Sequence, residues 1–281
     1  MTDLDTSAST RKLIDIAAAS RRCNRFRRRI LAVSQQVQAL HIGSAYSCVE
    51  IVDCIYFELM KGGIGGSSPD TFLLSKGHGC LIQYVILEEL GLLSRRDLDL
   101  YCTSAGRLGV HPDYGNPGIA AATGALGHGL SMSVGMAYAE KVKGGKGLVY
   151  CVLSDGEVQE GSTWEATMIA SSLGVNNLIA FIDNNDLQAL ARISMSLPSF
   201  YPVSDKYVAF GWEVVEVDGH DSEAIYNAVA SRRGERPLMV VCKTVKGKGV
   251  SYMENEPIWH YRSPNPVEYQ QALRELEQAQ A

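Results

Sequence analysis

Oxygen-bearing side chains follow two apolar runs of this sequence, at the point where each run ends. Asp155 follows the run at 147–153, and Asn185 comes thirty positions later, after the run at 178–183. If these runs are neighbouring parallel strands, both residues lie at the sheet edge where ligands bind. Their oxygens suit Mg²⁺ or Ca²⁺, particularly when a diphosphate supplies further ligands. Either segment alone is typical of a turn, so the prediction depends on the pair.

Continuous apolar runs alternate with amphipathic segments along most of the chain. Buried strands are expected at 147–153, 178–183, 213–217 and 238–242, and 72–74 is a shorter apolar run. Helices are expected within 10–40, after Ser47, and at 80–90, 126–143, 160–173 and 221–232. This alternation predicts an α/β fold with a doubly wound, mainly parallel sheet covered by helices on both faces. We expect one domain over residues 1–245, with 246–281 as a C-terminal extension packing on it.

Composition excludes several classes of protein. The net charge of −5 argues against a nucleic-acid binder, which would carry a basic excess. We interpret the six arginines at 21–29 as a solvated helix face. The seven cysteines are scattered without a C-x-x-C pair, which favours neither a zinc site nor disulfides and indicates a reducing cytoplasm. No signal peptide or membrane-spanning run is evident.

Asp155-Gly156, a helix, a strand and then Asn185 have the spacing of the thiamine-diphosphate fingerprint. Histidines recur in order in L-H-I-G-S (His41), L-L-S-K-G-H-G (His78), V-H-P-D-Y (His111) and W-H-Y-R (His260), and T-G-A-L-G-H-G-L occupies 123–130. With these motifs the sequence resembles, from about residue 10 to 270, the N-terminal subunit of a split, two-component transketolase. That family belongs to the thiamine-diphosphate (ThDP) enzyme superfamily, so the resemblance implies its diphosphate-binding fold.

The resemblance implies three groups of site residues. Asp155, Asn185 and the main-chain carbonyl of Leu187 would hold Mg²⁺ or Ca²⁺, which bridges the diphosphate of ThDP. Cofactor-binding residues would be His78, Gly124, Leu126, Gly156, Glu157, Asn185 and His260. The catalytic group would be His41, His111, Glu160 and His260.

Their implied roles differ. His41 and His111 would contact donor hydroxyls and transfer protons, which histidine can do near neutral pH. His260 would lie nearer the substrate entrance. Glu160 would contact a glutamate from the partner subunit, although it also suits the first turn of a helix.

The reaction implied is transfer of a two-carbon ketol unit from a ketose donor to an aldose acceptor. The family activates its cofactor with a glutamate from a pyrimidine-binding domain, which this chain would receive from a C-terminal transketolase subunit. We expect a heterotetramer with two copies of each subunit, inactive when either is missing.

Departures from the family pattern leave the substrate open. Val110, His128 and Tyr261 replace the family's usual residues around the expected substrate funnel, and Ser154 replaces the first glycine of G-D-G. A ThDP-dependent acyloin synthase, a 2-oxoacid-decarboxylating subunit and a non-catalytic scaffold subunit stay as alternatives. Lys246 and Lys248 are either phosphate ligands or solvated, and we interpret His220 as structural. A nicotinamide-binding protein is disfavoured because G-x-G-x-x-G is absent from the first strand turn.

Overall fold

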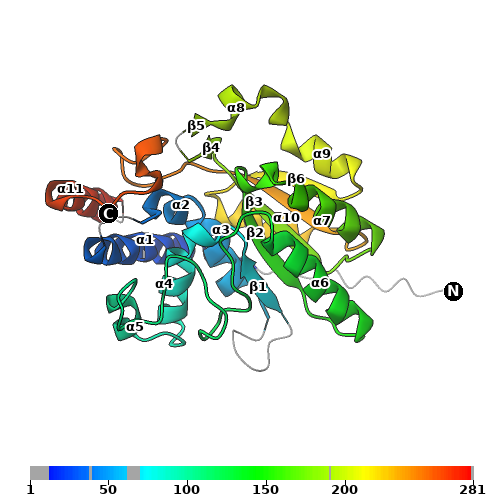
Figure 1. The fold of residues 1–281 in the computed structure, drawn as a ribbon, viewed down its shortest axis with the longest axis horizontal. Helices are drawn as coiled ribbons and strands as arrows, with labels where there is room; N and C mark the ends of the chain where they lie inside the picture. Colours follow the sequence, from blue (N-terminus) through cyan, green and yellow to red (C-terminus); the bar gives the residue numbers. More distant parts are fainter. Residues whose placement is uncertain (1–12, 38–39, 62–69, 190, 280–281) are drawn as a thin grey trace.

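Five parallel strands form the central sheet of the computed structural model, which describes residues 13–37, 40–61, 70–189 and 191–279 (Figure 1). The strand order is β1-β2-β3-β7-β6. Their bounds are β1 Thr71–Leu74, β2 Val149–Ser154, β3 Leu178–Asn184, β6 Glu213–Asp218 and β7 Leu238–Lys243. A short antiparallel pair, β4 (Leu187–Gln188) and β5 (Ala191–Arg192), lies beyond β3. The predicted parallel sheet is confirmed.

Helices cover one face of the sheet in a layer built largely from the N-terminal part of the chain. It contains α1 (Ile16–Val33), α2 (Ile42–Ser47), α3 (Val49–Cys54), α4 (Leu81–Glu89), α10 (Ser222–Ala230) and α11 (Pro266–Gln278). Their apolar side chains pack with Phe72, Tyr150, Val152 and Phe181 of the strands. Because side chains alternate along a strand, the intervening residues point to the other face.

A second layer packs on that other face. It consists of α6 (Gly129–Val142), α7 (Gly161–Ser172) and α9 (Val203–Ala209), whose buried residues meet Leu73, Cys151, Leu153 and Ile182. The remaining short elements are η1 (Ser34–Gln36), η2 (Ile55–Leu59), η3 (Gly77–Gly79), α5 (Arg95–Asp99), η4 (Glu157–Gln159), α8 (Ile193–Ser196), η5 (Pro198–Phe200) and η6 (Pro257–His260). The doubly wound arrangement is therefore confirmed.

Three details of the predicted elements need correction. The strand expected to be buried at 213–217 is the edge strand β6, and its side chains are half-buried or exposed because only β7 pairs with it. The helix expected after Ser47 is preceded by α2, which begins at Ile42. The helix expected within 10–40 is α1, while residues 10–12 and 38–39 lie outside the described residues.

The arginines at 21–29 form ion pairs rather than a free solvated face. Arg27 is buried and bonds both Glu50 oxygens at 2.6 and 2.8 Å. Arg22, Arg25, Arg28 and Arg29 pair with Asp53 and Glu58, Glu89, Glu277, and Glu88 and Asp99 respectively. Most of this basic cluster therefore ties α1 to α3, α4 and α11.

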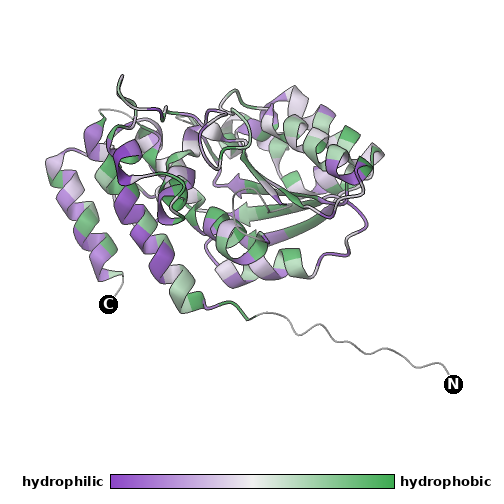
Figure 2. Ribbon diagram, turned by 90° about the horizontal axis from the view of Figure 1, so that it is seen from below, coloured by the Kyte–Doolittle hydropathy of each residue, from purple (hydrophilic) through white to green (hydrophobic). Residues whose placement is uncertain are grey.

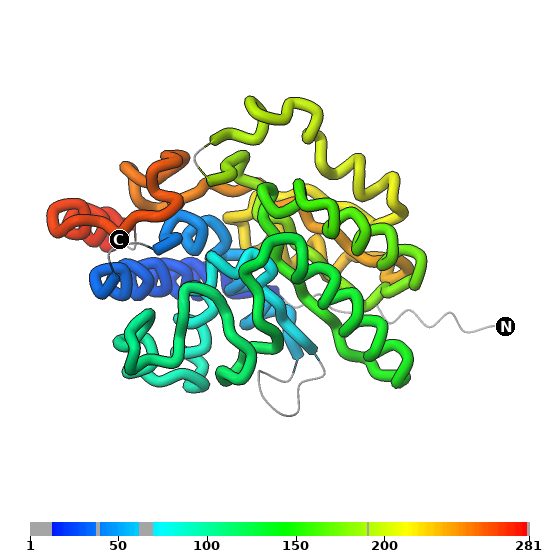
Figure 3. Tube along the Cα trace, in the orientation of Figure 1, coloured from blue at the N-terminus to red at the C-terminus, as the bar shows by residue number. Residues whose placement is uncertain are grey.

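The C-terminal helix α11 closes the same layer and lies beside α1 (Figure 3). The Asn24 side chain donates to the backbone oxygen of Leu276 at 2.8 Å. Figure 2 shows the hydrophilic outer sides of these two helices against a mainly hydrophobic sheet. No helix in the described part of the chain is long and apolar enough to span a membrane.

Candidate active site

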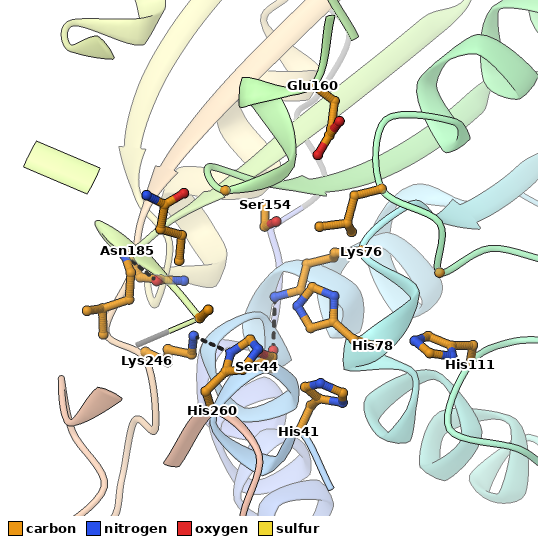
Figure 4. A pocket seen from close by; sticks show the side chains of 16 residues that line it. His41, Ser44, Lys76, His78, His111, Ser154, Glu160, Asn185, Lys246 and His260 are labelled. Atoms are coloured by element: carbon orange, nitrogen blue, oxygen red, sulfur yellow. Dashed lines mark hydrogen bonds between the residues drawn. The ribbon is translucent and has the colours of Figure 1, made fainter. Parts of the chain in front are cut away.

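Most of the predicted site residues meet in one cavity of about 370 Å³, beyond the carboxyl ends of β1, β2, β3 and β7 (Figure 4). It is lined by His41, Ser44, Lys76, His78, His111, Gly124, Leu126, Ser154, Gly156, Glu160, Asn185, Leu187, Gln188, Ala189, Lys246 and His260. Ten of the twelve predicted residues are among these. The other two, Asp155 and Glu157, are fully buried next to lining residues. A volume of this size suits a small-molecule ligand.

The ends of β2 and β3 are joined through Asp155. One carboxylate oxygen accepts from the backbone N–H groups of Asn185 at 2.9 Å and Asp186 at 2.6 Å, and the other accepts from Gly156 at 2.8 Å. The Asn185 side chain is fixed beside it, because its amide nitrogen donates to Ser47 at 3.1 Å and its oxygen accepts from the Leu187 backbone N–H at 3.1 Å. Both predicted strand tips therefore converge.

The charge of Asp155 is not compensated by any side chain in the described parts of the chain. Burial, with the added negative charge of nearby Asp183, raises the pKa of Asp155 to about 7. A divalent cation would supply the missing positive charge, and oxygen donors suit Mg²⁺ or Ca²⁺. Among the described residues, no three His, Cys, Asp or Glu side chains gather to hold a metal. The predicted set, with one carboxylate, one amide and one carbonyl, fits a cation whose other ligands come from a diphosphate.

A buried ion pair beneath the cavity was missed by the sequence interpretation. Lys76 is 1% exposed, forms an ion pair with Asp183, and donates to the backbone oxygen of Ser44 at 2.9 Å. Burial opposes the charge of Lys76, but Asp183 raises its pKa above the ordinary value. Asp183 also accepts from Ser47 at 2.5 Å and from Thr244. The signal was present, since Lys76 directly follows a strand in the quoted L-L-S-K-G-H-G segment.

Three imidazoles cluster on one side of the cavity, facing Glu160 across it in Figure 4. The His41 ring centroid lies 5.2 Å from that of His78 and 5.1 Å from that of His260. Burial lowers the pKa of His41 to about 3 and that of His260 to about 4, and the positive charges of neighbouring groups lower both further. Burial also lowers the pKa of His78 well below its ordinary value. These rings are therefore neutral at physiological pH and can both donate and accept hydrogen bonds.

Lys246 lies in the cavity wall, whereas Lys248 does not. Lys246 is 3% exposed, with its Nζ 3.1 Å from Nδ1 of His260. Burial, together with the positive charge of Lys76, lowers the pKa of Lys246 to about 8. Lys248 lies within 3.8 Å of Glu254 instead. Cationic groups that repel each other in a buried site favour an anionic ligand, which would relieve the repulsion.

The glycine-rich loop at 123–128 forms another wall. Gly124 has φ +130°, and a Cβ there would lie 2.5 Å from the His111 ring, so only glycine lets this ring pack on the loop. Glu157 holds the loop from beneath by accepting from the Gly127 backbone N–H at 2.9 Å and from Ser75 at 2.5 Å. Its buried position corrects the expectation that Glu157 faces the ligand directly.

Glu160 is exposed at the first residue before α7 and lines the cavity. Among the described residues, none donates a hydrogen bond to its carboxylate. The side chain therefore does not cap α7, although this position suits a negative charge. It is free to meet a group from outside the chain.

The sequence departures are not all at the cavity. The Tyr261 ring lies 4.7 Å from His41 at the cavity margin, and Ser154 lines the wall. His128 is exposed at the start of α6 and does not line the cavity, so its placement in the substrate funnel is wrong. His220 joins Glu50 at 2.9 Å to the Val245 backbone N–H at 2.8 Å, which gives it a structural contact.

Comparison with known proteins gives a consistent result. The family described as "Transketolase, thiamine diphosphate binding domain" matches residues 20–264. One of two "Apulose-4-phosphate transketolase" subunits that resemble this chain comes from Phocaeicola vulgatus and is 37% identical, over 89% of this chain and 90% of that protein. "6-deoxy-6-sulfo-D-fructose transketolase subunit SqwG" of Clostridium sp. is 35% identical, over 84% and 88%.

The fold is also that of solved transketolases. The structure of the Campylobacter jejuni enzyme superposes with a TM-score of 0.85 at 24% identity, over 95% of this chain. The present chain spans 43% of that protein's length. The family match runs past residue 245, and the predicted division there stays a prediction.

Proposed function

The chain belongs to the transketolase family, whose thiamine-diphosphate-binding domain it matches, and on this premise we propose that it is the diphosphate-binding subunit of a two-component transketolase. The reaction is transfer of a two-carbon ketol unit from a ketose donor to an aldose acceptor. ThDP, when bound, supplies the carbanion that makes this transfer possible. The observation that carries the proposal is the convergence of ten predicted residues on one cavity, with Asp155 buried behind it.

We assign the cation to Asp155, the Asn185 side chain and the Leu187 carbonyl. A Mg²⁺ ion, or Ca²⁺, would neutralise both Asp155 and the diphosphate of the cofactor. Lys246 and His78 lie where a diphosphate would relieve their mutual repulsion. Gly124, Leu126 and Gly156 supply the wall where the backbone or an apolar side chain approaches the cofactor. Glu157 positions the glycine-rich loop.

His41, His111 and His260 are assigned to the substrate. Since the rings of His41 and His260 are neutral at physiological pH, each can accept a proton or donate a hydrogen bond to a sugar hydroxyl. The relatives are named for apulose-4-phosphate and 6-deoxy-6-sulfo-D-fructose. Ketoses with an anionic end group are therefore the first donors to assay.

The remaining half of the site is assigned to a partner. Glu160 lines the cavity without a hydrogen-bond donor from the described chain and would face the glutamate of a pyrimidine-binding subunit. The relatives that are named as individual transketolase subunits support such a division of labour. We propose a heterotetramer with two copies of each subunit, working in the cytoplasm, where free cysteines such as those of this chain persist.

Reconstitution tests the proposal. The chain is combined with a pyrimidine-binding chain encoded beside it, ThDP and Mg²⁺, and assayed with ketose phosphates or pyruvate as donor. We expect ketol transfer from the ketose, lost when either chain is omitted. Release of carbon dioxide from pyruvate without ketol transfer would favour the decarboxylating or acyloin-forming alternative. Full activity of the complex with Asp155→Ala would favour a scaffold subunit.

A further inference from the structure

The outer sides of α6 and α7 are unusually poor in charge. Both helices turn one face to the sheet, with Leu130, Val134 and Ala137 of α6 and Ala166 and Ala170 of α7 buried there. The opposite face of α6 exposes Ser131, Gly135, Tyr138, Ala139 and Val142, and that of α7 exposes Gly161, Glu165, Met168, Ile169 and Ser172. Only Glu165 is charged among these ten. A helix without a polar side is expected to be covered on both sides.

One further charged residue, Lys141, is exposed on α6 but turns along the layer. Its Nζ donates to the backbone oxygen of Gly174 at 2.6 Å, just beyond the end of α7. It therefore ties the two helices together rather than solvating their outer face. In the other layer, the outer side of α11 carries Gln270, Arg274, Glu277 and Gln278, as a solvent-facing helix should.

The apolar part of this face approaches the size of an interface. Its large side chains are Tyr138 (43% exposed), Val142 (68%), Met168 (51%), Ile169 (47%) and Leu173 (37%). Together they expose on the order of 450 Å², the size of an apolar patch that is often functional on a monomer. The small exposed residues between them widen the face toward the ~800 Å² that each partner contributes to a standard interface.

The position of these side chains decides what covers them. α6 starts after the cavity loop at 123–128, and α7 starts after Glu160, so both helices run away from the cavity (Figure 1). All five large apolar residues lie in the second half of their helix or just beyond it. A subunit that completes the cavity at the strand ends therefore need not reach them.

We propose that this face, here called the α6–α7 face, is the two-fold contact between two copies of this chain. A nearly uncharged surface is compatible with its own copy, since a two-fold axis brings identical residues together and like charges there would repel. Homodimer interfaces are richer in apolar area than other contacts. Ser131, Gly135 and Ala139 recur every four residues on α6 and leave room for a helix of the other copy to pack closely. The contact supplies the two-fold axis of the proposed heterotetramer and rests on the proposed function only for the identity of the second subunit.

The mass of the purified full chain in solution tests the inference. Light scattering behind size exclusion is expected to give twice the chain mass of 30.6 kDa. Ile169→Glu and Val142→Glu, made separately, place a charge against its own copy and are expected to weaken dimerisation by at least about tenfold. Val267→Glu is the matched control, because Val267 is 77% exposed but lies on α11; this variant should stay dimeric. Far-ultraviolet circular dichroism checks that each variant is folded.

Two results would overturn the inference: a wild-type chain that is monomeric at every concentration, or a dimer that both α6–α7 variants leave intact. If the chain alone is monomeric and Ile169→Glu prevents binding of the pyrimidine-binding chain, the face belongs to that partner and the inference fails. Ketol transfer is measured on the same samples. Retained transfer without a dimer refutes only this contact, and a dimer without transfer refutes only the proposed function.

Discussion

The two helical layers of this protein cover the same sheet in different ways. In the layer of α1, α3, α4 and α11, arginines pair with carboxylates, and the pair of Arg27 and Glu50 is buried. In the layer of α6 and α7, no ion pair between charged side chains is found within the described residues of either helix. The first layer is completed by its own chain. The second has an outer side that is suited to contact with another protein.

The cavity lies at the junction of these layers. His41 and Lys76 come from the first layer or the strand beneath it, whereas Glu160 and the loop before α6 lead into the second. Residues that hold a cofactor are thus anchored on the completed side, and the carboxylate expected to meet a partner is on the side left open. This difference teaches that burial and charge pairing distinguish the part of the molecule that is finished from the part that is not.

The largest expected effect comes from breaking the first layer at Arg27. Arg27→Leu leaves the buried carboxylate of Glu50 without its main partner, which should cost about 3–5 kcal/mol of unfolding free energy. Urea denaturation measures it. Arg25→Leu is the control, because its pair with Glu89 is exposed and should be worth at most about 1 kcal/mol. Equal losses in the two variants would contradict the distinction between a buried and a solvated part of this layer.

A smaller effect is expected from acid at the junction. His41 and His260 have pKa values of about 3 and about 4 in the folded chain, below the ~6.5 of an unfolded histidine. Between these values the unfolded chain binds more protons, so the histidine contribution to stability is lost as the pH falls from about 7 toward 4. The double variant His41→Asn/His260→Asn should show a flatter dependence of unfolding free energy on pH in this window. Parallel curves for variant and wild type would mean that these rings are not buried as described.

Removing the cap of α11 should cost less. The Asn265 side chain accepts from the backbone N–H groups of Val267 and Glu268, both at 2.9 Å, and Glu268 returns a bond to Asn265. Asn265→Ala should lower the unfolding free energy by about 1 kcal/mol. Gln270→Ala on the exposed side of the same helix should leave it unchanged. A cap without effect would mean that α11 contributes little to closing its layer.

The smallest effect on the fold itself is expected at the α6–α7 face. Met168→Lys should change the unfolding free energy of the dilute, monomeric chain by no more than about 0.5 kcal/mol, because the residue is half exposed. The thermal midpoint of the wild type should rise with protein concentration, since association stabilises the folded state, whereas that of the variant should not. Identical concentration dependence would show that the face does not take part in association.

Sequence patterns identify what is local in this protein. Asp155, Asn185 and the histidines were found because each follows an element whose apolar run is continuous. The partial exposure of β6 was not predicted, because the run at 213–217 does not reveal that only one strand pairs with it. The ion pairs of the arginines at 21–29 depend on acidic residues far along the chain, as when Arg28 meets Glu277. The role of Lys76 depends on Asp183, which is 107 positions away.

The most direct test of the central claim is cofactor binding at Asp155. Titration calorimetry of ThDP into the chain and its pyrimidine-binding partner, with Mg²⁺ or with EDTA, should show binding that requires the metal. Asp155→Ala should weaken this binding by at least about 100-fold, whereas Asp186→Asn, next to the site but bonded to Ser194, should bind like the wild type. Unchanged affinity and metal dependence in Asp155→Ala would contradict the assignment of the cation and diphosphate to this cavity.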